Sequence, residues 1–154
     1  MNWEYIKNIG VIFSKDLLIF KFGEKRSVFR ANLKYKKQSN SGRSPNEDSY
    51  ENVLGTKDFL RLSFNNKDEL EEIEILRGQV LFDKVAISIN GNLSETLAIL
   101  EKSCSCKFHV GDISYTDFEN KFDLGDSYKN GAEKNSIAWF YTAPDLSHLK
   151  TKSA

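Results

Sequence analysis

Residues 59–75 constrain the fold more than any other stretch, because their pattern is that of a β-hairpin. Apolar side chains recur at every second position of residues 60–64, which is the period of a strand with one buried face. Residues 65–68 read Asn-Asn-Lys-Asp, and Asn and Asp favour turns because they tolerate a left-handed backbone. Residues 72–75 alternate again, with isoleucine after glutamate. We therefore expect two antiparallel strands joined by a polar turn.

The register of this hairpin follows from its apolar positions. If Leu62 faces Ile73, then Arg61 lies opposite Glu74 on the solvent side, which is a modestly favourable cross-strand pair. Strand alternation also turns Glu72 and Glu74 away from the buried isoleucines. The hairpin therefore predicts a glutamate-bearing outer face and an apolar inner face.

The first third of the chain mixes clear and ambiguous segments. Residues 9–13 predict a short strand, whereas residues 15–22 are long enough for two helical turns but also rich in branched and aromatic residues; we favour a helix there. Residues 28–35 alternate between apolar and polar positions and predict a strand. Residues 38–49 lack apolar side chains and collect Ser, Asn, Gly and Pro, which predicts a flexible loop.

The second half predicts more strands and one capped helix. Residues 80–89 supply one or two strands that would extend the hairpin into a meander of three or four strands. The spacing of Asn92 and Glu95 is that of a capping box, so we expect a helix from about Leu93 to Ser103. One stripe of that helix should pack on the sheet; it consists of Leu93, Leu97, Leu100 and Cys104.

Near the C-terminus, residues 136–142 are almost continuously apolar, as in a central strand that is covered on both faces. Residues 145–154 should form a short helical or frayed tail. The predicted fold is α+β: residues 1–154 form a single domain with a mainly antiparallel sheet, a β-meander, and one or two helices packed on it.

Length and composition limit the class of protein. A chain of 154 residues suits one domain, and 40% hydrophobic and 12% aromatic residues supply enough apolar material for a packed interior. No apolar run approaches the roughly 18 to 20 residues of a membrane span, and the N-terminal residues lack the pattern of a signal peptide. We therefore expect a cytoplasmic protein without a membrane partner.

Motifs for catalysis and for cofactors are missing from the sequence. Cys104 and Cys106 have no second cysteine pair to complete a zinc site, and we interpret both as structural thiols. Neither His109 nor His148 has a Cys or Ser at a spacing that suggests a nucleophile and its base. Phosphate-binding glycine loops and the zinc-protease motif are absent. The sequence therefore predicts a protein that is not an enzyme and has no cofactor and no metal ion.

The charges are unevenly distributed although the net charge is zero. Residues 1–44 carry ten Lys and Arg against three Asp and Glu, whereas residues 45–126 carry eight against seventeen. The basic segment 25–37, with interleaved aromatics, leaves open a nucleic-acid-binding regulatory module, although the acidic remainder would repel phosphate. A small enzyme that uses carboxylates, or a divalent-cation site, is a further alternative; its candidates are Asp117, Glu119, Asp123 and Asp126.

Three stretches carry a resemblance to a known class of proteins: residues 60–75, residues 118–125 and residues 137–141. Their order resembles that of small cytoplasmic immunity proteins of bacterial polymorphic-toxin and contact-dependent growth inhibition systems, over about half of the chain. The resemblance implies that the protein binds one cognate toxin, commonly a nuclease, and neutralises it. It carries over no individual binding residue.

Charge gives this interpretation a physical basis. Nuclease domains tend to be cationic because they bind phosphate, so an acidic inhibitor can imitate the substrate and attract the toxin electrostatically. Aromatic anchors inside a charged rim are typical of protein interfaces. The predicted partner-binding residues combine both features, and they are Glu72, Glu74, Tyr115, Asp117, Phe118, Glu119, Asp123 and Asp126.

Overall fold

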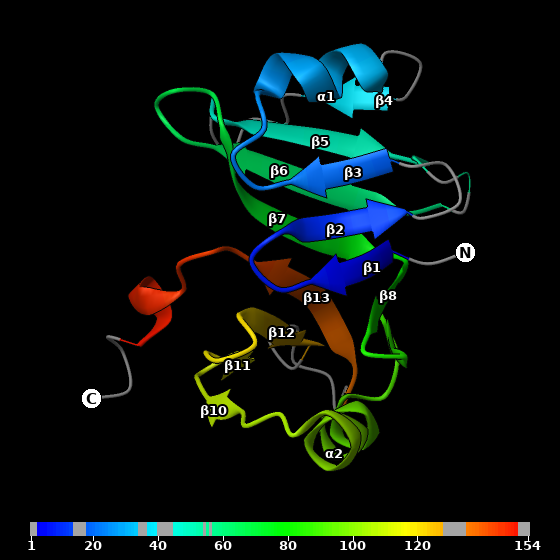
Figure 1. Ribbon diagram of the computed structural model, residues 1–154. Coiled ribbons are helices and arrows are strands. Elements are labelled where there is room, and N and C mark those ends of the chain that lie inside the picture. The colour runs from blue at the N-terminus through cyan, green and yellow to red at the C-terminus, as the bar shows by residue number, and fades with distance from the viewer. Residues whose placement is uncertain are drawn as a thin grey trace.

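The computed structural model describes residues 3–13, 18–33, 37–39, 45–53, 55, 57–127 and 135–150. Within them, the strands form two sheets (Figure 1). The larger sheet has the order β10-β11-β12-β13-β7-β6-β5-β4, and all of its neighbours are antiparallel. Its strands are β4 (Lys37–Ser39), β5 (Glu47–Glu51), β6 (Phe59–Phe64), β7 (Leu70–Arg77), β10 (His109–Val110), β11 (Ser114–Asp117), β12 (Phe122–Asp126) and β13 (Ile137–Thr142).

The smaller sheet has the order β3-β2-β1-β8-β9, in which β1 and β8 are parallel and the other neighbours are antiparallel. Its strands are β1 (Trp3–Ile6), β2 (Gly10–Phe13), β3 (Leu18–Lys21), β8 (Gln79–Phe82) and β9 (Val85–Ser88). Two α-helices lie at opposite ends of this arrangement, α1 (Arg26–Asn32) and α2 (Leu93–Cys104) (Figure 1). The described part of the chain ends near the 3-10 helix η2 (Ser147–Leu149). The predicted α+β class is confirmed.

The central hairpin has the predicted register. In β6 and β7, Leu62 pairs with Ile73 and Arg61 pairs with Glu74. The Arg61 Nη1 atom lies 3.2 Å from Glu74 Oε1, so the expected cross-strand pair is present on the outer face. Ile73 is buried, as the alternation predicted.

The chain leaves the larger sheet directly after β7. Gly78 has a φ of 121°, a backbone conformation that residues with a side chain rarely adopt, and it separates β7 from β8. Strands β8 and β9 do exist at the predicted place, but β8 pairs with β1 rather than continuing from β7. Residues 80–89 therefore belong to the second sheet, and the predicted continuous meander is wrong at this point.

Two assignments in the first third are reversed. Residues 18–21, for which we favoured a helix, form strand β3, while residues 26–32, which overlap the predicted strand 28–35, form helix α1. Phe29 and Leu33 are buried, and positions i and i+4 face the same side in both a strand and a helix. The alternation therefore did not distinguish the two structures. Tertiary contacts favour the helix, because Arg26 and Arg30, also four residues apart, both bind Asp48.

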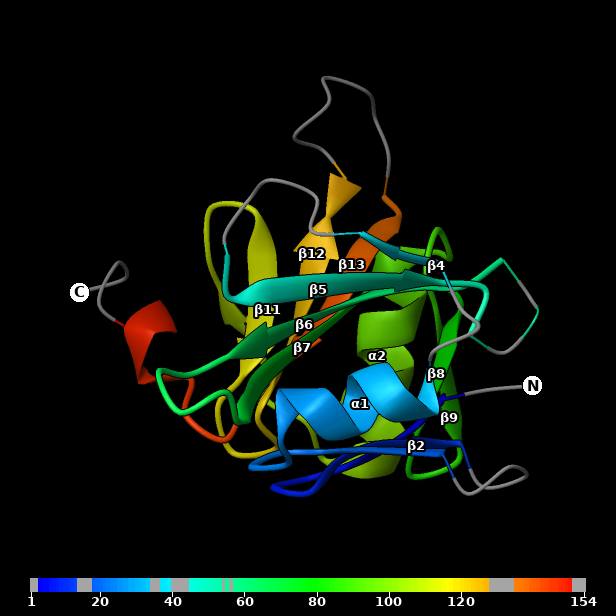
Figure 2. The ribbon, with the colours of Figure 1, turned by 90° about the horizontal axis from the view of Figure 1, so that it is seen from above.

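Helix α1 fills the space between the two sheets at one end, as the view from above shows (Figure 2). The ring of Phe29 is 5.6 Å from that of Phe20 in β3 and 6.0 Å from that of Phe64 in β6. The ring of Phe20 also lies 5.2 Å from Trp3 in β1. These aromatic contacts join the helix to both layers.

The predicted loop at 38–49 is wrong at both of its ends. Lys37–Ser39 form β4 and Glu47–Glu51 form β5, and the two strands pair with each other. Residues 40–44, the middle of that prediction, lie outside the described residues. Strand β5 also pairs with β6, so its backbone is hydrogen-bonded to a neighbouring strand on each side. This pairing forms the strand although the segment has few apolar side chains.

Helix α2 and its cap are confirmed. The Asn92 side chain accepts a hydrogen bond from the Glu95 amide at 2.9 Å, and the helix spans Leu93–Cys104. Leu93 and Leu100 are buried, whereas Leu97 is partly buried and packs against the core. The predicted stripe therefore faces the interior.

Candidate protein-binding surface

The outer face of the larger sheet carries a continuous row of polar side chains. In adjacent strands, Arg61 pairs with Glu74, Glu74 with Tyr141, Tyr141 with Asp123, and Asp123 with Thr116. Paired residues in a sheet point to the same side, so this row crosses β6, β7, β13, β12 and β11 on one face. The neighbouring residues of each strand point inward and form the core.

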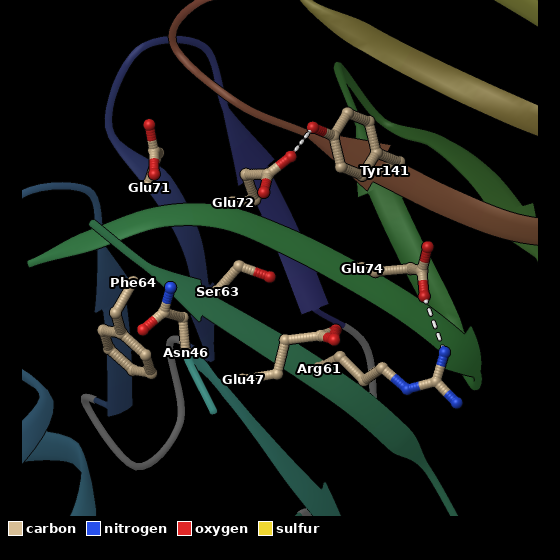
Figure 3. Close-up of a pocket in the computed structure, with 9 residues that line it drawn as sticks. All are labelled: Asn46, Glu47, Arg61, Ser63, Phe64, Glu71, Glu72, Glu74 and Tyr141. Carbon is tan, nitrogen blue, oxygen red and sulfur yellow. Dashed lines mark hydrogen bonds and ion pairs between the residues drawn. The ribbon is translucent and has the colours of Figure 1, made fainter. Parts of the chain in front are cut away.

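One half of this face is a groove rich in carboxylates, which we name the acidic groove (Figure 3). It has a volume of about 310 Å³ and contains four glutamates and one arginine. Glu72 and Glu74 project from the same side of β7, the first toward Tyr141 and the second toward Arg61 (Figure 3). The residues that line the groove are Asn46, Glu47, Arg61, Ser63, Phe64, Glu71, Glu72, Glu74 and Tyr141.

Tyr141 positions Glu72 without neutralising it. The Tyr141 hydroxyl donates a hydrogen bond to Glu72 Oε2. Burial raises the pKa of Tyr141, and the neighbouring Glu72 raises it further, so the phenol keeps its proton. The groove thus presents four carboxylates against the single guanidinium of Arg61.

The other half of the face is a wider hollow beside Trp139, which we name the Trp139 pocket. It has a volume of about 610 Å³. Its floor includes Asp123, which is only 4% exposed and accepts hydrogen bonds from Thr116 Oγ1 at 2.6 Å and from Trp139 Nε1 at 3.0 Å. The residues that line it are His109, Val110, Gly111, Asp112, Ile113, Ser114, Thr116, Phe118, Asp123, Trp139, His148 and Leu149.

Burial raises the pKa of Asp123, although the hydrogen bonds from Thr116 and Trp139 act in the opposite direction. Both neighbours donate protons to the carboxylate, which is the arrangement that suits its ionised form. Ser114 provides a third side-chain hydrogen bond to this carboxylate. A carboxylate can accept about four hydrogen bonds, so Asp123 retains about one acceptor position.

Trp139 lies directly over Gly125. A Cβ atom added to Gly125 would come within 2.1 Å of the Trp139 ring, so only glycine allows the indole to lie flat against β12. We expect Gly125→Ala to displace the indole, break its hydrogen bond to Asp123 and lower the free energy of unfolding by about 1 to 3 kcal/mol. Chemical denaturation and the indole N–H resonance would measure the two effects. Gly111→Ala is the control, because its added Cβ would meet only ordinary or slightly tight contacts; an unmoved Trp139 resonance in Gly125→Ala would contradict the prediction.

Three of the eight predicted site residues lie in strands of this face: Glu72 and Glu74 in the acidic groove and Asp123 in the Trp139 pocket. Asp123, however, is buried rather than part of an exposed acidic rim. Phe118 also lines the Trp139 pocket from the turn between β11 and β12. Glu119, in the same turn, is exposed.

Asp117 does not supply surface charge, contrary to the sequence interpretation. It is 1% exposed, and its Oδ1 atom accepts hydrogen bonds from the amides of Glu119 at 3.0 Å and Asn120 at 2.9 Å. Its Oδ2 atom accepts from the Lys107 amide at 3.2 Å. The carboxylate therefore holds the turn that follows β11, because an aspartate readily bonds the backbone two and three residues ahead.

Tyr115 and Asp126 also lie away from the groove. Tyr115 pairs with the buried Leu124, so it faces the inner side of the sheet and packs against the core. Asp126 ends β12 near Ile113, whose carbonyl accepts a hydrogen bond from the Asp126 amide. The sequence prediction therefore did not separate residues of the outer face from those of the inner face in β11 and β12.

Sequence reasoning missed several residues of this surface. Trp139 and Tyr141 were read as part of a strand covered on both faces, but their side chains lie on the outer face and are partly exposed. Glu47 was placed in a loop, although it lies in β5 and lines the acidic groove. The available signal was the presence of two ring systems with polar tips at alternate positions of a central strand.

Three cationic residues of the basic segment 25–37 form ion pairs within the protein. Arg26 and Arg30 both bind Asp48, each at 2.7 Å, and Lys25 Nζ lies 3.7 Å from Glu69. Residues 26–32 of this segment form a helix rather than the basic strand that the nucleic-acid alternative required. Lys34 and Lys36 lie outside the described residues.

Metal and thiol chemistry find no support among the residues that the structure describes. These residues contain no group of three or more His, Cys, Asp or Glu that could hold a metal ion. Burial raises the pKa of the Cys106 thiol to about 12, which keeps it in the unreactive protonated form. Across the same described ranges, no helix has the length and apolar character needed to cross a membrane.

No protein-family model matches the chain, and neither a curated protein nor a solved structure matches it. The class of protein must therefore be inferred from the surface itself. That surface is an acidic groove beside an aromatic pocket, on the outer face of an eight-stranded sheet.

Proposed function

We propose that this protein is an immunity protein that binds a cognate bacterial toxin in the cytoplasm and neutralises it by direct protein–protein contact, without catalysis. The toxin would be a cationic nuclease domain. The observation that carries the proposal is the acidic groove, which is lined by Glu47, Glu71, Glu72 and Glu74 and by a single arginine.

The charges of the groove suit such a partner. A nuclease surface that binds nucleic acid presents arginine and lysine to phosphate, and a row of carboxylates can occupy the same positions. A cluster of negative charges also accelerates association with a positively charged partner. Added salt weakens this attraction, because salt screens charges that are more than about 8 to 10 Å apart. The resemblance to immunity proteins, based on residues 60–75, 118–125 and 137–141, supports the same class.

The test begins with the product of the gene directly upstream, produced as a catalytically inactive toxin domain. Purified protein should form a stable complex with it and should suppress the nuclease activity of the active form. The absence of both effects would remove the proposed function.

A charge-reversed variant then tests the groove. We expect Glu47→Lys combined with Glu71→Lys to slow association by about tenfold or more at low salt, because the attraction that guides encounter is reversed. Glu72 is kept in this variant because it accepts the hydrogen bond from Tyr141. Stopped-flow fluorescence at several salt concentrations would measure the rate.

The matched control is Glu4→Lys with Glu101→Lys, which makes the same change in net charge at two exposed positions outside the groove. This variant should associate at close to the rate of the unmodified protein. Equal slowing in both variants, or an unchanged rate in the groove variant, would contradict recognition by the acidic groove. Stronger binding of the groove variant to nucleic acid than to the toxin would favour the nucleic-acid alternative.

A further inference from the structure

The Trp139 pocket has a chemistry different from that of the acidic groove. Its walls contain the rings of Trp139, Phe118 and His109, and its floor contains the carboxylate of Asp123. The acidic groove, by contrast, has several carboxylates around one arginine. A buried carboxylate beside aromatic rings is suited to one particular cationic side chain rather than to a general positive charge.

Exposed apolar side chains lie at the rim of this pocket. Val110 is 67% exposed and Ile113 is 40% exposed, and both lie at the hairpin formed by β10 and β11. Neighbouring exposed apolar side chains beside a pocket are typical of a surface that another protein covers. The apolar rim therefore indicates a protein partner rather than a free ion.

The pocket already attracts cations from its own chain. The Nζ atom of Lys150 lies 5.0 Å from the centre of the Phe118 ring, a cation–π distance. His148 also lines the pocket. Both groups belong to the C-terminal segment after β13 and are exposed, so an incoming side chain could displace them from the aromatic walls.

Register places the pocket beside the groove. Asp123 pairs with Tyr141, which pairs with Glu74, and Tyr141 lines the acidic groove. A protein that covers the groove would therefore also cover the pocket. We propose that the Trp139 pocket takes an arginine side chain of the protein partner, a role that rests on the protein-binding function proposed above.

Arginine fits better than lysine for geometric reasons. Its planar guanidinium can stack on Trp139 or Phe118 while one of its N–H groups donates to the remaining acceptor position of Asp123. A lysine ammonium is a more strongly hydrated point charge and gains less from the flat aromatic walls. Arginine is also among the side chains that contribute most at protein interfaces.

The isolated protein can test this without the toxin. The probe is arginine blocked at both ends, N-acetyl-arginine amide, titrated into ¹⁵N-labelled protein. The indole N–H of Trp139 donates to Asp123 and should shift, whereas the indole of Trp3, which is 1% exposed in the core, should not. A Trp139→Phe variant assigns the two signals. The expected affinity is in the millimolar range, about 1 to 10 mM, because only one side chain is bound.

Two comparisons separate a cation site from a general apolar hollow. The neutral analogue, N-acetyl-citrulline amide, has almost the same shape and should bind about tenfold more weakly, because it lacks the charge-assisted hydrogen bonds. Asp123→Asn should weaken arginine binding to a similar extent, and Asp83→Asn, the same change at an exposed position outside the pocket, should leave it within about twofold. The citrulline comparison remains decisive if Asp123→Asn does not fold.

An unmoved Trp139 signal at saturating probe, equal binding of arginine and citrulline, or equal effects of the two asparagine variants would each overturn the arginine pocket. None of these results would affect complex formation with the toxin, which is measured separately. Conversely, arginine binding with no toxin complex would overturn the immunity function while leaving the pocket chemistry intact.

Discussion

Replacing Asp48 by asparagine is expected to lower the free energy of unfolding by about 3 to 5 kcal/mol, because it removes one partner of a buried charge network. The Asp48 side chain is fully buried. It accepts hydrogen bonds from Arg26 Nη2 at 2.7 Å, from Arg30 Nη2 at 2.7 Å and from Arg30 Nε at 2.9 Å. The Tyr50 hydroxyl donates a further bond at 3.3 Å. The neutral variant would leave two guanidinium groups without their shared carboxylate.

The control variant is Asp68→Asn. Asp68 also approaches Arg26, at 3.7 Å, but its side chain is 66% exposed. Exposed ion pairs contribute at most about 1 kcal/mol, so this change should have a small effect. Urea denaturation of both variants would compare them. Equal losses would show that Asp48 contributes no more than a surface pair.

The pH dependence of stability gives a second measurement of the same network. Burial alone would raise the pKa of Asp48, but the hydrogen bonds and charges of Arg30 and Arg26 outweigh it and lower the pKa from 3.8 to about 2. A depressed pKa in the folded protein stabilises the fold above the unfolded pKa, and this contribution is lost as the pH falls through the folded pKa. The difference between the original protein and Asp48→Asn should therefore shrink as the pH is lowered from about 5 to about 2. A constant difference over that range would contradict the assignment.

Phe122→Ala is expected to cost about 3 to 5 kcal/mol of unfolding free energy, because it removes the ring at the centre of the contact between the two sheets. Phe122 is fully buried. Its ring lies 5.9 Å from Tyr5 in β1, 5.2 Å from Phe82 in β8 and 5.5 Å from Phe140 in β13. The alanine variant would leave a cavity that strands on both sides cannot easily close.

Phe118→Ala is the matched control, since the same residue type lies four positions earlier in the turn and is only partly buried. It should destabilise the protein much less. Phe122→Leu keeps most of the volume and should cost less than about 1.5 kcal/mol. Thermal and chemical denaturation of the three variants would give the ranking. A loss in Phe118→Ala as large as that in Phe122→Ala would show that the central ring has no special role.

The fold was predictable from sequence where the determinants are local. The hairpin of residues 59–75 and the helix capped by Asn92 are specified by alternation, turn residues and a cap within a few positions of each other. The helix of residues 26–32 was not predictable in the same way. It is favoured by the ion pairs of Arg26 and Arg30 with Asp48, and Asp48 lies in strand β5, outside the segment. The transfer of β8 to the second sheet likewise depends on pairing with β1, far away in the sequence.

The candidate surface shows the same division. Alternation within β7 was enough to place Glu72 and Glu74 on the outer face. For Asp117 and Asp123 the charge of the residue suggested exposure, but backbone amides, Thr116 and Trp139 hold these carboxylates in buried positions. Such partners become visible only when the register of β11, β12 and β13 is known.

The parallel pairing of β1 with β8 has a consequence for how the chain folds. Trp3 pairs with Val80, which is half of the chain length away in the sequence. Strand β1 lies between β2 and β8 in the smaller sheet. During synthesis the first three strands can form their hairpins early, but one edge of β1 stays open until β8 has emerged from the ribosome. Contacts between such distant residues form slowly, because the chain between them must first be ordered. We therefore expect closure of the smaller sheet to be a late step of folding, and until then the open edge of β1 can pair with another strand.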